Sequence, residues 1–174
     1  MKKISFFIVA LLFATNAFAH DYITKEEVLE AQDKWAQGIV DISKAYIEKE
    51  DYRAAAKKHI DDLYAYGVTD VLFKPTLAVE DQFRENFDQA LSYFVGGSVK
   101  EDKGFAIKPW KAARFDGDQH IAVYHDYAVS MGNYFFTPVD GSPEQKVEFT
   151  FGYLKDEKGD LRINLHHSSL PYNP

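Results

Sequence analysis

The chain has 174 residues, and its 20 Lys and Arg against 27 Asp and Glu give a formal net charge of −7 at pH 7. Such an acidic chain is a poor partner for nucleic acid or anionic lipid, so we expect neither. The absence of cysteine excludes disulfides and thiol chemistry. The aromatic content of 16% favours a sheet-rich fold or an aromatic-lined cavity.

The first 19 residues have the pattern of a secretory signal peptide. Two lysines at positions 2 and 3 precede an apolar run over 4–13, which is short for a membrane span, and Ala17-Phe18-Ala19 is a small-x-small cleavage site. We expect residues 1–19 to be removed and residues 20–174 to form one periplasmic or secreted domain without a membrane anchor. Loss of the two lysines would change the formal charge from −7 to −9.

Helices are expected in the first half of the mature chain. Residues 24–27, Thr-Lys-Glu-Glu, have the spacing of a capping box, and the apolar stripe that follows keeps helical spacing to about residue 48. A second helix is expected to reach about Leu63. After a short strand at 68–73, recurring phenylalanines predict a third helix over 80–94.

The second half of the chain has the alternation of β-strands, separated by turn sequences rich in Asp and Gly. Helices followed by a meander of strands predict an α+β domain, with the N-terminal helices packed on a strongly curved antiparallel sheet. A cone-shaped cavity between the two layers would suit a small ligand. The expected strands cover residues 112–115, 119–125, 127–137, 145–154 and 161–169.

The last of these strands ends in two histidines and two serines. At period two, His167 and Ser169 extend the apolar face that Ile163 and Leu165 begin, whereas His166 falls on the other face. This alternation predicts that His167 and Ser169 face the cavity. A lone strand histidine is usually structural, so other residues must support a functional role.

The sequence contains a group of motif stretches at residues 73–76, 90–97, 104–106, 131–137, 149–153 and 161–172. Together they resemble the bacterial branch of the iota-class carbonic anhydrases. This family has the SnoaL-like fold of the nuclear transport factor 2 group and is related to the association domain of calcium/calmodulin-dependent protein kinase II. The most specific stretch is His-His-Ser-Ser-Leu-Pro-Tyr after the Arg-Ile-Asn-Leu strand.

The resemblance implies a lyase that hydrates carbon dioxide reversibly to bicarbonate in a pocket between helices and sheet. In metal-free members the site is built from a Thr, a Tyr, a His and a Ser. Matched by motif, these are Thr76, Tyr93 and a His and a Ser from residues 166–169. The family does not fix which His, and the strand alternation selects His167 as general base, with Ser169 beside it.

Further residues of the motifs are expected to contact the substrate: the rings of Phe94 and Phe151 would hold carbon dioxide, with Tyr134, His166 and Ser168 nearby. The fold group also implies a homodimer, formed through the outer face of the sheet. Larger assemblies remain open.

A zinc site is the competing interpretation, because zinc or manganese would activate water more directly. Adjacent His166 and His167 point to opposite faces of a regular strand, so they cannot both reach one ion without a bulge. His120 and His125 also face opposite ways in an unbroken strand, and His59 is the fifth histidine that such a site would draw on. We therefore expect no cofactor.

Two other functions fit the same fold. One is a non-catalytic association or ligand-binding module, which would not need Thr76, Tyr93, His167 and Ser169 to converge. The other is a SnoaL-like isomerase or hydratase with an acid deep in the cavity. Asp126 and Glu148 are the strand acids to inspect for that role.

Overall fold

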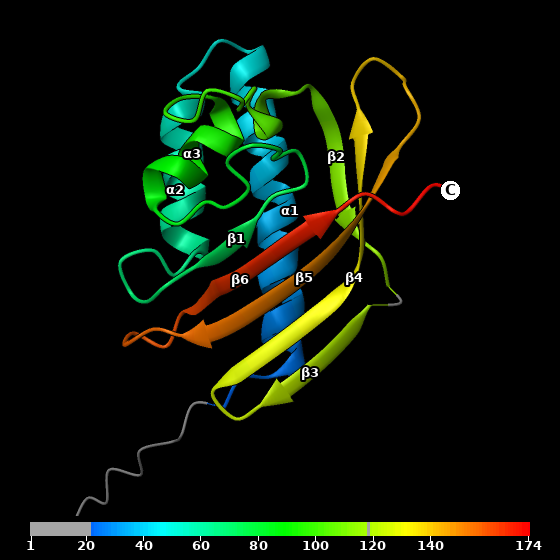
Figure 1. Cartoon of the computed structure of the whole chain (residues 1–174). Coiled ribbons are helices and arrows are strands. Elements are labelled where there is room, and N and C mark those ends of the chain that lie inside the picture. Colours follow the sequence, from blue (N-terminus) through cyan, green and yellow to red (C-terminus); the bar gives the residue numbers. More distant parts are fainter. Residues whose placement is uncertain (1–21, 118) are drawn as a thin grey trace, which may run out of the picture.

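The computed structural model describes residues 22–117 and 119–174, and the predicted signal peptide, residues 1–19, lies outside them. Three helices precede five of the six strands (Figure 1). The helices are α1 (Lys25–Ile47), α2 (Tyr52–Leu63) and α3 (Phe87–Val95), and a 3-10 turn spans Phe105–Ile107. The strands are β1 (Leu72–Lys74), β2 (Trp110–Phe115), β3 (His120–Tyr124), β4 (Tyr127–Pro138), β5 (Gln145–Lys155) and β6 (Leu161–Ser169).

The first helix begins where the sequence predicts it. The Thr24 side chain accepts from the Glu27 backbone N–H, and the Glu27 carboxylate accepts from the Thr24 N–H, which completes the capping box. Because this reciprocal cap satisfies two of the backbone donors that a helix leaves open, it fixes the start of α1.

The sheet has the order β1-β6-β5-β4-β2, and β3 pairs with the other half of β4. Its pairs are antiparallel except β1–β6, which is parallel. The helices lie against one face, with α1 running across it, and the sheet bends around them without closing (Figure 1). The α+β fold with helices on a curved sheet is confirmed.

A β-bulge in β6 changes which residues face the helices. Gly152 pairs with Leu165 and Tyr153 pairs with Ile163, so Asn164 is an extra residue on β6. The alternation shifts by one at that point, and the buried residues of β6 are Ile163, His166 and Ser168. The prediction that His167 and Ser169 continue the Ile163 face is therefore wrong.

The third helix is shorter than its apolar pattern predicted. It starts at Phe87 instead of near residue 80, because the Asn86 side chain caps it by accepting from the Gln89 backbone N–H. The preceding segment, residues 75–86, is a loop. The Arg84 N–H donates to the Phe73 carbonyl, which ties this loop to β1.

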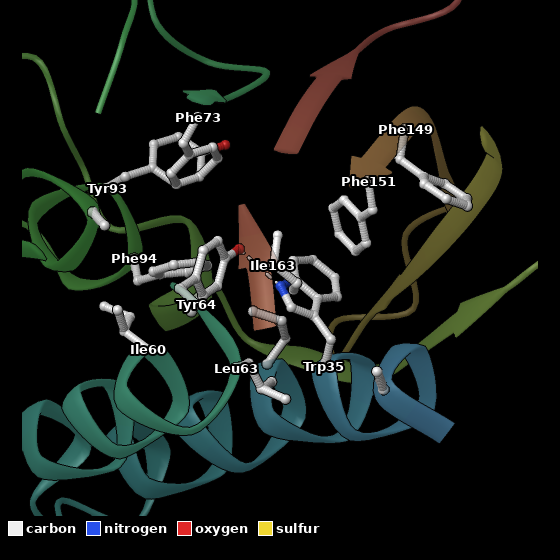
Figure 2. Packing of buried hydrophobic residues seen from close by; sticks show 14 of the residues in the cluster. Trp35, Ile60, Leu63, Tyr64, Phe73, Tyr93, Phe94, Phe149, Phe151 and Ile163 are labelled. Atoms are coloured by element: carbon white, nitrogen blue, oxygen red, sulfur yellow. Dashed lines mark hydrogen bonds between the residues drawn. The ribbon is translucent and has the colours of Figure 1, made fainter. Parts of the chain in front are cut away.

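The space between helices and sheet is filled mainly by aromatic rings. Trp35 of α1 lies near the centre, stacked on Tyr134 at 5.4 Å between ring centroids. Figure 2 shows how rings from the helices and from the sheet meet in this layer. In the part of the chain that the structure describes, no helix is long and apolar enough to cross a membrane.

The two long helices approach closely where Gly38 faces His59. A Cβ at position 38 would lie 2.1 Å from His59 Nδ1, so only glycine admits this ring. His59 is buried against Trp35 and Phe94, and burial lowers its pKa from 6.5 to about 4. The folded protein consequently holds His59 neutral at pH values where an exposed histidine is charged.

Acidification is therefore expected to destabilise the fold. Between pH 6.5 and about 4 the unfolded chain binds a proton at His59 that the folded chain does not. Stability thus rises with pH across this window, and about 3 kcal/mol is lost as the pH falls through it. Urea unfolding of the wild type and His59→Leu over this range measures the effect. The variant should show a shallower pH dependence, and identical slopes would contradict the assignment.

Candidate active site

Four hydroxyl groups from different parts of the chain meet between helices and sheet. Thr76 follows β1, Tyr93 lies on α3, Tyr134 on β4 and Ser168 on β6. We call these four residues the hydroxyl cluster. The two tyrosines and Ser168 are buried, and Thr76 is half-buried.

A direct hydrogen bond joins two members of the hydroxyl cluster. Thr76 Oγ1 donates to Ser168 Oγ at 2.8 Å. Burial raises the pKa of Tyr93 and of Tyr134 well above the ordinary value, and hydrogen bonding with Thr76 opposes this only in part. Both phenols therefore stay protonated near neutral pH and act as hydrogen-bond donors.

His166 lies beside the hydroxyl cluster and is buried by aromatic rings. Its ring stacks on Phe73 at 4.5 Å, and Phe151 meets it edge-on at 4.3 Å. Its Nδ1 is 2.8 Å from the Tyr64 hydroxyl, and its Nε2 is 3.5 Å from the Tyr134 hydroxyl. Burial lowers the pKa of His166 well below 6.5, so its imidazole is neutral.

His167 and Ser169, the two residues that the sequence alternation selected, lie on the outer face of the sheet. His167 is exposed, and Ser169 donates to the Glu148 carboxylate at 3.0 Å. Both residues line a hollow of ≈ 350 Å³ that also contacts His120 and Met131. The prediction that His167 and Ser169 form the site is therefore corrected. Because of the bulge in β6, the His and Ser that reach the hydroxyl cluster are His166 and Ser168.

The structure brings together most of the other residues that the sequence singled out. Thr76, Tyr93 and Tyr134 belong to the hydroxyl cluster, and Phe94 and Phe151 are fully buried in the aromatic layer. Sequence reasoning missed Tyr64, which directly contacts His166. Tyr64 comes immediately after α2, 102 positions before His166, and only its place at the end of a helix suggested an inward side chain.

The histidines proposed as zinc ligands do not gather at one point. His59 lies on α2 with its ring against α1, His125 is in the turn after β3, and His166 lies on the helix-facing side of β6. His120 and His167 share the outer hollow. Over residues 22–117 and 119–174, no group of three or more His, Cys, Asp or Glu side chains has an arrangement that could hold a metal ion.

Comparison with known proteins decides the family. The family model described as "Metal-independent carbonic anhydrase" matches residues 26–170. The chain belongs to the metal-independent carbonic anhydrase family. A curated member of that name from Nostoc sp. (strain PCC 7120) is 43% identical over an alignment of 155 residues, and the alignment covers 86% of this chain and 75% of the relative.

Among solved structures, one relative agrees with this family and a more distant one shows the same fold. A cyanobacterial iota-carbonic anhydrase in complex with bicarbonate superposes with a TM-score of 0.84 at 42% identity, covering 88% of this chain and 96% of that one. A nuclear transport factor 2-like protein from Salmonella enterica has a TM-score of 0.53 at 16% identity, with 86% and 92% covered. The iota-class resemblance, the fold group and the expectation of a carbonic anhydrase are confirmed.

Proposed function

We propose that this carbonic anhydrase hydrates carbon dioxide at the hydroxyl cluster and that Thr76, Tyr93, Tyr134 and Ser168 hold the bicarbonate formed there. The carrying observation is the 2.8 Å hydrogen bond from Thr76 to Ser168, beside two buried phenols. The bicarbonate held by the cyanobacterial relative supports the same ligand here.

The hydroxyl groups suit the charge that the reaction creates. Water oxygen forms a bond to the carbon of carbon dioxide, a C=O electron pair moves onto an oxygen, and one proton leaves, which yields bicarbonate. The phenols of Tyr93 and Tyr134 remain protonated, so they donate to the oxygens on which negative charge develops. Because these donors are fixed by packing before the reaction, little reorganisation is needed.

The proton is proposed to leave along the paired hydroxyls. Ser168 is buried, whereas Thr76 is half-buried and thus nearer to solvent. In the structure Thr76 donates to Ser168, so outward transfer first requires both hydroxyl hydrogens to rotate until Ser168 donates to Thr76. Each hydroxyl then accepts one proton while it donates another, and neither becomes an anion.

Aromatic rings give carbon dioxide an apolar place beside the hydroxyls. Phe94 packs against Tyr93 at 5.8 Å between ring centroids, and Phe151 packs against His166 at 4.3 Å. An apolar surface with a few convergent polar groups is the usual composition of a small-ligand site.

The isomerase alternative has less support. Asp126 lies exposed in the turn between β3 and β4, and Glu148 lies exposed on the outer face of the sheet. Neither of these two carboxylates faces the hydroxyl cluster.

Carbon dioxide hydration by residues 20–174 is expected to survive removal of metal. Because the proposed donors are all hydroxyls, a chelator should leave the rate unchanged. Stopped-flow hydration assays on chelated protein, with metal content assayed on the same sample, measure this. Activity that returns only after zinc or manganese is added would contradict the metal-free site, and folded protein inactive with or without metal would contradict the function.

The outer face of the sheet is the proposed surface of a homodimer. Exposed Met131 and the hollow around His167 lie there, opposite the helices. Light scattering should give twice the mass of one chain, and Met131→Lys should shift the protein toward monomer. A wild-type protein that is monomeric at all concentrations would contradict the proposal.

Export to the periplasm or beyond is proposed from the composition of residues 1–19. Protein recovered from outside the cytoplasm should begin at His20 by N-terminal sequencing. A protein that keeps Met1 and remains in the cytoplasm would contradict it.

A further inference from the structure

Three buried side chains form a line of hydrogen bonds that ends at His166. Trp35 Nε1 donates to the Tyr64 hydroxyl at 3.0 Å, and that hydroxyl lies 2.8 Å from His166 Nδ1. Figure 2 shows Trp35 and Tyr64 turned toward each other in the aromatic layer, with the bond between them dashed. All three side chains are buried, so each bond is shielded from solvent.

The chemistry of the indole group sets the direction of the line. An indole N–H only donates, so Tyr64 oxygen is the acceptor of that bond. If His166 Nδ1 carried a hydrogen, it would also donate to Tyr64, and the single Tyr64 hydrogen would have no acceptor among the described contacts. A buried donor left unpaired is costly, so Tyr64 donates to a bare Nδ1.

A neutral imidazole carries one hydrogen, which must then be on the other nitrogen. We propose that Tyr64, oriented by the Trp35 N–H, is a positioning residue that holds His166 in the tautomer protonated at Nε2. This inference concerns the site of the proposed function. The Nε2–H then faces the Tyr134 hydroxyl oxygen at 3.5 Å.

This tautomer assigns His166 a role different from that of a general base. With Nδ1 occupied by Tyr64 and Nε2 already protonated, neither nitrogen is free to accept a proton from water. His166 instead donates toward the Tyr134 oxygen, which leaves the Tyr134 hydrogen available for an oxygen of the substrate. The imidazole supports the donor that stabilises negative charge.

Packing keeps the imidazole in this orientation. Phe73 covers one face of the ring at 4.5 Å with an interplanar angle of 8°, and Phe151 and Trp35 meet it edge-on. A ring flip would place carbon where Nδ1 now meets Tyr64. The same rings disfavour the charged imidazolium, which agrees with the lowered pKa of His166.

Nitrogen-15 NMR of the histidine rings in ligand-free protein tests the tautomer directly. We expect His166 Nε2 to carry the hydrogen and Nδ1 to resonate as an unprotonated nitrogen that accepts a hydrogen bond. A hydrogen on Nδ1 would overturn the proposal. This measurement needs only wild-type protein and is independent of catalysis, so a failure of the proposed function would appear separately, as absent carbon dioxide hydration.

Tyr64→Phe and Tyr66→Phe form a matched pair for the positioning role. Both remove a phenol hydroxyl that donates one hydrogen bond, but Tyr66 donates to the Arg84 carbonyl at 2.6 Å instead of to His166. Tyr64→Phe also removes the acceptor of the Trp35 N–H. Tyr64→Phe should populate the second tautomer and lower kcat/KM about 10–100-fold, as loss of an outer partner of a functional histidine does at metal sites. Tyr66→Phe should keep the wild-type tautomer. The proposal would be overturned if His166 had the same tautomer, and carbon dioxide hydration the same kcat/KM, in both variants.

Discussion

Replacing Ser168 by alanine is expected to lower kcat/KM for carbon dioxide hydration about 100-fold, the effect of removing one preorganised hydrogen-bonding group from an anion-stabilising site. The buried Ser168 hydroxyl is the partner of Thr76 at 2.8 Å and lies on the proposed route of the proton. Thr76→Val, which removes the other hydroxyl at similar volume, should lower the rate by a similar factor. If the two hydroxyls act as a pair, the double variant should be little worse than either single variant.

Ser169→Ala is the matched control, because it makes the same change one residue later on the opposite face of β6. It removes only the exposed bond to Glu148, so the rate should stay within about 2-fold of the wild type. Stopped-flow assays on chelated protein, with thermal unfolding of each variant, separate activity from stability. A loss confined to Ser169→Ala would contradict the hydroxyl cluster and identify the outer hollow as the site.

The sequence-based prediction of this site failed at one position, and the reason is local. Side chains alternate between the two faces before and after the bulge in β6. Because Asn164 is an extra residue, the even-numbered residues after it face the helices, whereas the odd-numbered residue Ile163 does so before it. The sequence did contain one indication of the bulge, which is Gly152 in the neighbouring strand β5. A glycine inside a strand often marks a bulge, and a Cβ there would lie 2.3 Å from the Tyr127 hydroxyl and 2.9 Å from Leu165 Cβ.

Other parts were predictable to the extent that they depend on local patterns. The capping box at Thr24 and the alternation over residues 145–154 gave the first helix and the fifth strand, because those signals act within a few residues. Contacts between segments that are distant in the chain have no comparable local pattern in the sequence. The Tyr64 contact with His166 and the close approach of Gly38 to His59 depend on how helices pack on the sheet.

The start of α3 shows the same limit. Phenylalanine spacing alone extended this helix back to residue 80, but Arg84 is needed elsewhere: its side chain is fully buried and pairs with the buried side chain of Asp102. Such an ion pair has no signature in hydrophobic periodicity. The pair anchors Arg84 near the end of the loop over residues 75–86, and Thr76 lies near the start of the same loop. We therefore expect the pair to support both the fold and the site.

Breaking this ion pair is expected to give the largest loss of stability. Arg84 Nη2 lies 2.5 Å from Asp102 Oδ1, and the guanidinium also donates to the carbonyls of Asp81 and Phe83. In Asp102→Ala the Arg84 charge would stay buried without its carboxylate, which should cost about 3–5 kcal/mol of unfolding free energy. Removing Arg84 as well should recover part of that loss, because no unpaired charge would remain.

Glu144→Ala is the matched control, since Glu144 pairs with Arg114 at 2.8 Å on the surface. Solvent screens this pair, so its loss should cost only about 0–1 kcal/mol. Urea unfolding of the variants compares both effects, with the slope of the transition checked for a common unfolded state. Similar losses in Asp102→Ala and Glu144→Ala would mean that the buried pair adds no more than a surface pair. A large loss confined to Asp102→Ala, together with weaker carbon dioxide hydration in the folded fraction, would mean that the pair holds Thr76 in place.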